Sequence, residues 1–210
     1  LFITDLQEKF QTAGIEVKNS NLGQLPETTW FHYPSDYLGD IVHSLNVRSD
    51  NLYAESVLRL LSLSVHEKGS AEKGIDIIRK YWQNYEADSL ELFMYDGSGL
   101  ARNNKVSAKY LNCVLKETAR DSLIGEYFVQ TLPLAGKEGS VATFMKHGEL
   151  PGELRLKSGS MSDVHAYAGY YTTPQNRYAI VVMINNYTCT RAQLKQKIST
   201  LLTQVLSKKE

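Results

Sequence analysis

The sequence predicts an α+β fold, with helices before about residue 150 and an antiparallel sheet after it. Residues 152–157 alternate between apolar and charged side chains, which is typical of a half-buried β-strand. Residues 163–173 are rich in Tyr and Ala, and only the turn Ser162-Asp163 separates them from the first strand, so the two should form a hairpin. Residues 177–185 form a third, strongly apolar run after another turn signal. We therefore expect a three-strand meander.

Helices are predicted both before and after the three strands. Residues 190–207 place apolar side chains at helical spacing, so a C-terminal helix should close the meander. Upstream, Gly14 should end an opening helix, while Ser35-Asp36, Gly69-Ser70 and Ser107 are helix-start signals. The other expected elements are an irregular stretch over 16–34, a helix through 52–61, a short strand over 90–95, a tight loop over 96–100, a helix over 124–132, and a loop with a short helix over 135–147.

Composition excludes several functional classes. The chain has 210 residues, with 23 Lys and Arg against 23 Asp and Glu, so no net positive field favours nucleic acid as a partner. No apolar run approaches the roughly 20 residues of a membrane span. Cys113 and Cys189, expected on separate helices, lack a CxxC or a His partner at ligand spacing. We therefore expect neither a metal nor a cofactor.

Two short motifs could carry chemistry. Lys157-Ser158-Gly159 near the end of the first strand offers a cation, a hydroxyl and a residue without a side chain, which suits an anionic, peptide-like substrate. Ser49-Asp50-Asn51 falls between two predicted helices. Taken singly, the first could be a strand end with a solvated lysine, and the second could be a set of helix caps. Their order in one chain favours a functional interpretation.

A Ser-x-Asn followed by Lys-Ser/Thr-Gly on a strand is the second and third part of the penicillin-binding and serine β-lactamase active site. Four blocks extend the likeness: 49–55 (SDNLYAE), 96–104 (DGSGLARNN), 132–140 (LPLAGKEGS) and 157–161 (KSGSM). Together they resemble the D-alanyl-D-alanine carboxypeptidase/endopeptidase family, the class C low-molecular-mass penicillin-binding proteins. The resemblance covers nearly the whole chain and implies a β-lactamase/transpeptidase-like domain.

The resemblance also implies roles for individual residues. Ser49 would relay a proton to the leaving amine, Asn51 would hydrogen-bond the substrate amide, and Lys157 would supply positive potential. Ser158 and Ser160 would bind the substrate's terminal carboxylate, and the Ser160 N–H would donate to the oxyanion. Further substrate contacts are implied for Gly159, Met161, Gly99, Leu100 and Arg102. The guanidinium of Arg102 suits a side-chain carboxylate of the stem peptide, although an exposed loop arginine without a partner is an equal alternative.

One part of the family's catalytic machinery is missing from the expected position. The family's nucleophilic serine and its base lie in a Ser-x-x-Lys motif upstream of the Ser-x-Asn, and no such motif precedes Ser49. The only match, Ser70 to Lys73, lies downstream and is better interpreted as a helix cap. We therefore expect residues 1–210 to be the C-terminal part of a transpeptidase-like domain that lacks its nucleophile and is inactive alone.

The resemblance implies a serine carboxypeptidase that cleaves D-Ala-D-Ala and cross-links in peptidoglycan stem peptides through an acyl-serine intermediate. Its complete form would also bind β-lactams, and its location would be the periplasm or cell envelope. The alternative is a non-catalytic peptidoglycan- or protein-binding module that keeps the groove. The apolar run 177–185 would suit an interior strand, so the chain should pair there with its missing N-terminal segment or with a second copy.

Overall fold

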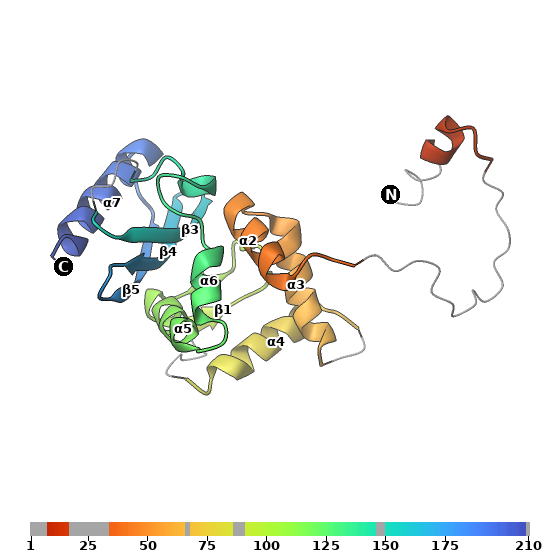
Figure 1. Ribbon diagram of the computed structural model, residues 1–210, viewed down its shortest axis with the longest axis horizontal. Coiled ribbons are helices and arrows are strands. Elements are labelled where there is room, and N and C mark those ends of the chain that lie inside the picture. Colours follow the sequence, from red (N-terminus) through yellow and green to blue (C-terminus); the bar gives the residue numbers. More distant parts are fainter. Residues whose placement is uncertain (1–7, 17–33, 66–67, 86–90, 146–149, 209–210) are drawn as a thin grey trace. The chain divides into compact units, whose positions relative to one another are not determined.

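Within residues 36–210, the C-terminal sheet is covered by helices on both faces (Figure 1). Its strands are β3 (Glu153–Met161), β4 (Val164–Thr172) and β5 (Arg177–Asn185), in the antiparallel order β3-β4-β5. Ser160 pairs with His165 across the β3–β4 hairpin, and the tight turn is possible because Asp163 adopts a left-handed backbone with φ of 57°. The predicted meander and its turns are confirmed.

Helices cover both faces of this sheet. Leu154 and Leu156 of β3 share a buried apolar cluster with α7 (Arg191–Leu206). The N-terminus of α7 carries a capping box between Thr190 and Gln193. The opposite face packs against α5 (Ala108–Arg120) and α6 (Gly125–Thr131). The predicted C-terminal helix and α+β class are confirmed.

The computed structural model describes residues 8–16, 34–65, 68–85, 91–145 and 150–208. Residues 1–35 and 36–210 form separate compact units. In the first unit, residues 8–12 are helical and Gly14, with φ of 73°, ends that helix as predicted; Leu6 and residues 17–33 lie outside the described residues. The second unit contains all the elements named above. It also contains α2 (Leu38–Arg48), α3 (Asn51–Leu63), α4 (Ala71–Trp82), β1 (Leu92–Phe93), β2 (Lys105–Val106) and the 3₁₀ helix η2 (Gly139–Val141).

Several predicted details differ from the structure. Helix α2 begins at Leu38 with Tyr37 as its N-cap, so the Ser35-Asp36 signal lies just upstream of the helix. Cys189 precedes the cap of α7 and is not helical, whereas Cys113 is on α5 as expected, and the two cysteines form no disulfide. Strand β2 was not predicted, because two residues carry no readable period. The short helix expected up to residue 147 is a single 3₁₀ turn in its described part.

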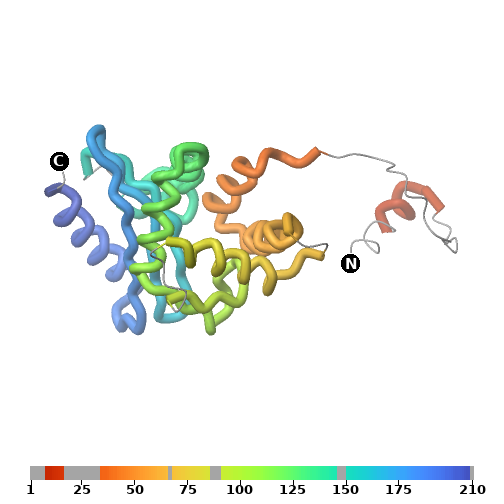
Figure 2. Tube along the Cα trace, turned by 90° about the horizontal axis from the view of Figure 1, so that it is seen from below, coloured from red at the N-terminus to blue at the C-terminus, as the bar shows by residue number. Residues whose placement is uncertain are grey.

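Helix α2 is in close contact with η2 and with α6. A Cβ at Gly139 would lie 2.2 Å from the Val47 carbonyl oxygen, so η2 sits directly on the last turn of α2. Asn46 on the same turn is buried and donates from Nδ2 to Thr131 Oγ1 of α6 at 3.1 Å. The tube view in Figure 2 shows α2 beside α6, on the side of the sheet opposite α7. These contacts fix where α2 ends, and α2 ends at the Ser49-Asp50-Asn51 motif.

Candidate active site

Ser49 and Lys157 meet in the folded protein. Lys157 Nζ donates to Ser49 Oγ at 2.6 Å, across 108 residues of sequence, and to the Ser158 carbonyl oxygen at 3.0 Å. Ser49 is the C-cap of α2, with φ of 56° and ψ of 48°. A serine in the left-handed region is strained, and such strain is concentrated at functional sites. The two motifs singled out from the sequence are therefore brought together at one point.

The triplet 49–51 is also a helix junction, as the capping interpretation predicts. Asp50 is the N-cap of α3, and its carboxylate accepts from the Tyr53 N–H at 3.0 Å. Asn51 opens α3 and is exposed. The cap satisfies the helix end, while Ser49 and Asn51 on either side remain available to a ligand.

Lys157 is a half-buried cation. Burial lowers the pKa of its ammonium from the ordinary value of 10.5. None of the described acidic side chains forms an ion pair with it; its contacts are the Ser49 hydroxyl and the Ser158 carbonyl. An uncompensated positive charge at this position favours anionic groups nearby.

Ser140 is a further member of the site that the sequence analysis did not single out. Its Oγ lies 2.7 Å from Ser158 Oγ, so the hydroxyl implied to bind a substrate carboxylate has a hydrogen-bonding neighbour. Ser140 belongs to η2, whose Gly139 rests on Val47 of α2. The only sequence signal was its place in the 132–140 block, where it was included without a role.

The segment leading to Ser140 is anchored on β3. The Ala135 N–H donates to the Leu154 carbonyl at 2.8 Å, and the Leu156 N–H donates to the Pro133 carbonyl at 3.0 Å. Arg155 adds a bond from Nη1 to the Leu132 carbonyl at 3.0 Å. These bonds hold the segment alongside the strand that carries Lys157 and Ser158.

A cavity of about 750 Å³ lies beyond Lys157, between the end of the sheet and the loop 96–104. Five of the residues implied to contact substrate line it: Gly99, Arg102, Gly159, Ser160 and Met161. Leu100 does not line it and is 60% exposed. Gly159 leaves the sheet floor open, since a Cβ there would meet only the Ala166 Cβ, at 3.9 Å. Arg102 is exposed at the rim and has no ion pair with another described residue.

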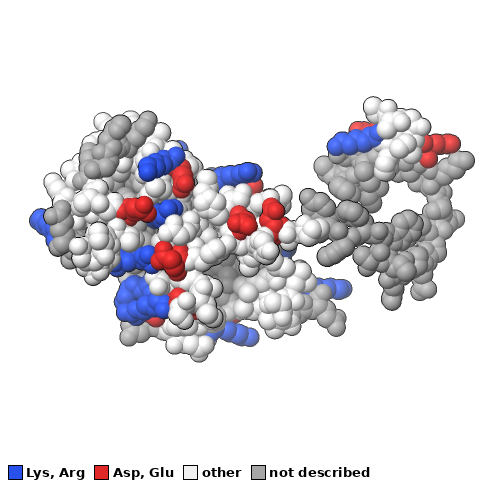
Figure 3. Space-filling model, in the orientation of Figure 1, with Lys and Arg blue, Asp and Glu red and all other residues white. Residues whose placement is uncertain are grey.

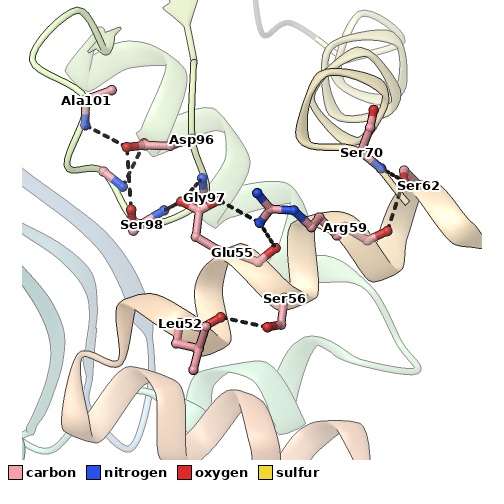
Figure 4. A network of polar contacts seen from close by, with 11 residues as sticks. Leu52, Glu55, Ser56, Arg59, Ser62, Ser70, Asp96, Gly97, Ser98 and Ala101 are labelled. Carbon is pink, nitrogen blue, oxygen red and sulfur yellow. Dashed lines mark hydrogen bonds and ion pairs between the residues drawn. The ribbon is translucent and has the colours of Figure 1, made fainter. Parts of the chain in front are cut away.

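Glu55 and Asp96 hold this cavity wall (Figure 4), a role that was not predicted from the sequence. Glu55 Oε1 accepts from the Gly97 and Ser98 N–H groups, both at 3.0 Å. The Asp96 carboxylate accepts from the Gly99 N–H at 2.9 Å and the Ala101 N–H at 2.6 Å. Both residues lie in the blocks that carry the resemblance, which was the only signal for them.

The downstream Ser-x-x-Lys match has a structural explanation. Ser70 caps α4, accepting from the Lys73 N–H at 3.1 Å, so the downstream Ser-x-x-Lys match is a helix start. His165 is buried between β4 and the α7 side, and neither ring nitrogen has a partner among the described residues. Burial lowers the pKa of His165 below 6.5, with Lys195 and Arg191 acting in the same direction.

Neither a metal-binding cluster nor a membrane-spanning helix is found within the described residues. Within them, no group of three His, Cys, Asp or Glu side chains could hold a metal ion. None of the helices in the described part of the chain combines the length and apolar character that a membrane span requires. On the face shown in Figure 3, acidic and basic side chains are interspersed.

This fold is that of the penicillin-binding proteins. The crystal structure of penicillin-binding protein 4 (dacB) from Haemophilus influenzae, complexed with a novel β-lactam, matches with a TM-score of 0.75 at 25% identity, covering 97% of this chain and 50% of that chain. The D-Ala-D-Ala carboxypeptidase 3 (S13) family matches residues 1–208, and the chain belongs to this family. The resemblance stated from the sequence is confirmed.

Curated relatives support the same assignment. The chain is 27% identical over 206 residues to the D-alanyl-D-alanine carboxypeptidase DacB of Haemophilus influenzae, a match covering 94% of this chain and 42% of the relative. It is 25% identical over 193 residues to a D-alanyl-D-alanine carboxypeptidase of an Actinomadura species, covering 86% of this chain and 36% of the relative. The chain thus spans about two-fifths of these curated relatives or less.

Proposed function

We propose that this chain is the part of a serine D-Ala-D-Ala carboxypeptidase/endopeptidase that carries the Ser-x-Asn and Lys-Ser-Gly motifs. The nucleophilic serine and its base lysine lie in an upstream segment of the same protein. The complete protein cleaves peptidoglycan stem peptides in the periplasm or cell envelope and is acylated by β-lactams. The observation that carries this proposal is the 2.6 Å contact between Lys157 Nζ and Ser49 Oγ.

That contact suits acyl transfer to and from a serine. The Lys157 cation stabilises negative charge as an oxyanion develops, and it favours the deprotonated form of the upstream base. The Ser49 hydroxyl, held by the same ammonium, passes a proton to the leaving amine. Asn51, one residue into α3, hydrogen-bonds the substrate amide.

Different parts of the substrate are bound on either side of Lys157. Ser158 and Ser160 bind its terminal carboxylate, and the Ser160 N–H is one oxyanion donor; Ser140, 2.7 Å from the Ser158 hydroxyl, orients that hydroxyl. Gly99 and Arg102 accept the substrate from the loop side, with Arg102 suited to a side-chain carboxylate. More than half of each curated relative lies outside the match, which leaves room for a nucleophile-bearing segment.

Fluorescent penicillin distinguishes this proposal from its rival. The full-length protein, incubated with the reagent and separated by denaturing electrophoresis, should carry a covalent label on an upstream Ser-x-x-Lys serine, while the 210-residue chain alone should carry none. Label on Ser70 or another serine of residues 1–210 would contradict the placement of the nucleophile. A full-length protein that takes no label would instead be a non-catalytic binding module.

A further inference from the structure

The loop 96–104, which forms one wall of the 750 Å³ cavity, is held by carboxylates. Asp96 organises the loop from inside: besides the Gly99 and Ala101 N–H groups, it accepts from Asn104 Nδ2 at 2.7 Å. Asn104 Oδ1 in turn accepts from the Tyr95 N–H at 2.8 Å. The loop therefore has a defined shape of its own.

Glu55 attaches that shaped loop to α3. Its Oε1 receives two backbone N–H groups, those of Gly97 and Ser98, at 3.0 Å each. Such charge-assisted bonds are stronger than bonds between neutral groups. Burial opposes ionisation of Glu55, but the bonds from Ser98 and Gly97 prevail and hold its pKa below the ordinary 4.5. The carboxylate is therefore ionised at neutral pH.

The loop also approaches α3 more closely than a side chain would permit. A Cβ at Gly97 would lie 2.6 Å from the Ala54 carbonyl oxygen and 3.2 Å from the Leu58 Cβ. Glu55 follows Asn51 by one helical turn, so both occupy the same side of α3. One helix face thus carries the candidate amide-binding residue and the anchor of the cavity wall.

We infer that Glu55 is a positioning residue that sets the distance between the Ser49–Lys157 centre and the cavity wall bearing Gly99 and Arg102. It controls how well the protein recognises a long, carboxylate-bearing substrate side chain, without contacting the reacting atoms. This inference rests on the proposed function. It adds that recognition of the substrate side chain in the cavity can change without a change in the rate of acylation.

The test compares two D-Ala-D-Ala peptides on the full-length protein: one with a long side chain ending in a carboxylate, the other with alanine at that position. Glu55→Ala should raise KM for the first peptide about tenfold, because a small displacement of a positioning group is costly. KM for the alanine peptide and the rate of penicillin acylation should stay within about twofold. Glu55→Gln, which keeps an oxygen acceptor without charge, should fall between wild type and Glu55→Ala.

Arg59→Gln is the matched control. Arg59 Nη1 pairs with Glu55 Oε2 at 3.2 Å on the exposed side, so this change removes the ion pair and leaves both N–H bonds of Oε1 in place. Exposed pairs of this kind contribute little, and all kinetic constants should match wild type. An Arg59→Gln defect equal to that of Glu55→Ala would contradict the assignment to the backbone bonds.

Three results would overturn the inference. The first is an unchanged KM for the long peptide in Glu55→Ala. The second is an equal loss of activity towards both peptides and of penicillin acylation in Glu55→Ala, which would indicate general damage to the fold. If wild type takes no penicillin label, the proposed function fails, and calorimetric affinities of the two peptides replace KM. In that case wild type should bind the long peptide more tightly than the alanine peptide, and Glu55→Ala should abolish this preference. The third overturning result is a wild type that lacks the preference or a Glu55→Ala variant that keeps it.

Discussion

At the scale of single residues, the charge of Lys157 serves the proposed reaction but reduces the stability of the folded protein. Its ammonium is half-buried and its pKa is lowered by that burial, while its described contacts are a hydroxyl and a carbonyl. A buried charge without an opposite charge reduces stability. Such a residue is retained when the charge itself has a use, and the use we propose here is stabilising a developing oxyanion.

Lys157→Met should therefore change stability and activity in opposite directions. In the full-length protein, penicillin acylation should slow by on the order of 10²-fold or more, as when an oxyanion donor is lost. The free energy of unfolding should rise by about 1 kcal/mol, because an apolar side chain of similar length replaces the partly desolvated cation. Stopped-flow acylation and urea denaturation measure the two effects.

The exposed Lys137, in the loop before η2, provides a matched control. Lys137→Met removes the same charge from the surface and should leave both measurements near wild type. If Lys157→Met acylates at the wild-type rate, Lys157 has no part in the reaction. If it unfolds more easily than wild type, the charge is compensated by a partner outside the described residues.

At the scale of elements, the start of α4 shows how a catalytic motif can be imitated by a helix cap. Ser70 Oγ accepts from the Lys73 N–H at 3.1 Å, and the Ser70 N–H donates to Ser62 Oγ at 2.7 Å (Figure 4). Ser62 is fully buried and also donates to the Arg59 carbonyl at 2.9 Å. Every part of the Ser70 environment is thus explained by joining α3 to α4.

Ser70→Ala should destabilise the protein without affecting acylation. Loss of an N-cap hydroxyl lowers the free energy of unfolding by about 1 kcal/mol, which corresponds to a fall in Tm of about 2–4 °C for a domain of this size. Calorimetry and penicillin labelling of the full-length protein measure the two properties. Ser70→Gly should lose only a few tenths of a kcal/mol, because glycine is tolerated at the N-cap. An acylation defect in Ser70→Ala would contradict its assignment as a cap.

The elements themselves were largely predictable because each carried its own local signal. The alternation in β3, the apolar run of β5 and the caps Ser70, Ser107 and Thr190 are properties of neighbouring residues. Strand β2 was missed because it exists only by pairing with β1. Secondary structure that depends on a distant partner leaves little trace in its own sequence.

The residues of the candidate site were likewise predictable only where the sequence itself carried a signal. Ser49, Lys157 and the Lys-Ser-Gly strand were found because the resemblance supplied their order, and the fold brings them within hydrogen-bond distance. Ser140 and Glu55 were missed because their importance lies in what they touch, across 18 residues for Ser140 and 42 for Glu55. A serine in a loop and a glutamate on a helix are ordinary until the chain is folded.

At the scale of the whole molecule, the sheet ends in a strand whose apolar composition is unusual for an edge. Strand β5 is the last in the order β3-β4-β5, and within the described residues no further strand pairs with it. Its run from Ala179 to Ile184 carries no charge, whereas natural edge strands are protected by charged residues, proline or bulges. Both faces of the sheet are covered by helices, so the backbone groups of β5 are what this edge offers a partner, although the Ala179 carbonyl already accepts from Asn112 Nδ2 of α5 at 3.3 Å.

We therefore expect the isolated 210-residue chain to self-associate through β5, by antiparallel pairing of two such edges. In the full-length protein, a strand from the remaining sequence should occupy this edge and keep the molecule monomeric. Sedimentation velocity should show the mass of the isolated chain rising with concentration, and Ile184→Lys should prevent the rise by placing a charge on the edge strand. Leu201→Lys, at a 51% exposed position of α7, tests whether any exposed apolar residue drives the association and should leave it unchanged. An isolated chain that stays monomeric while the β5 amides exchange rapidly with solvent would show that this edge needs no partner.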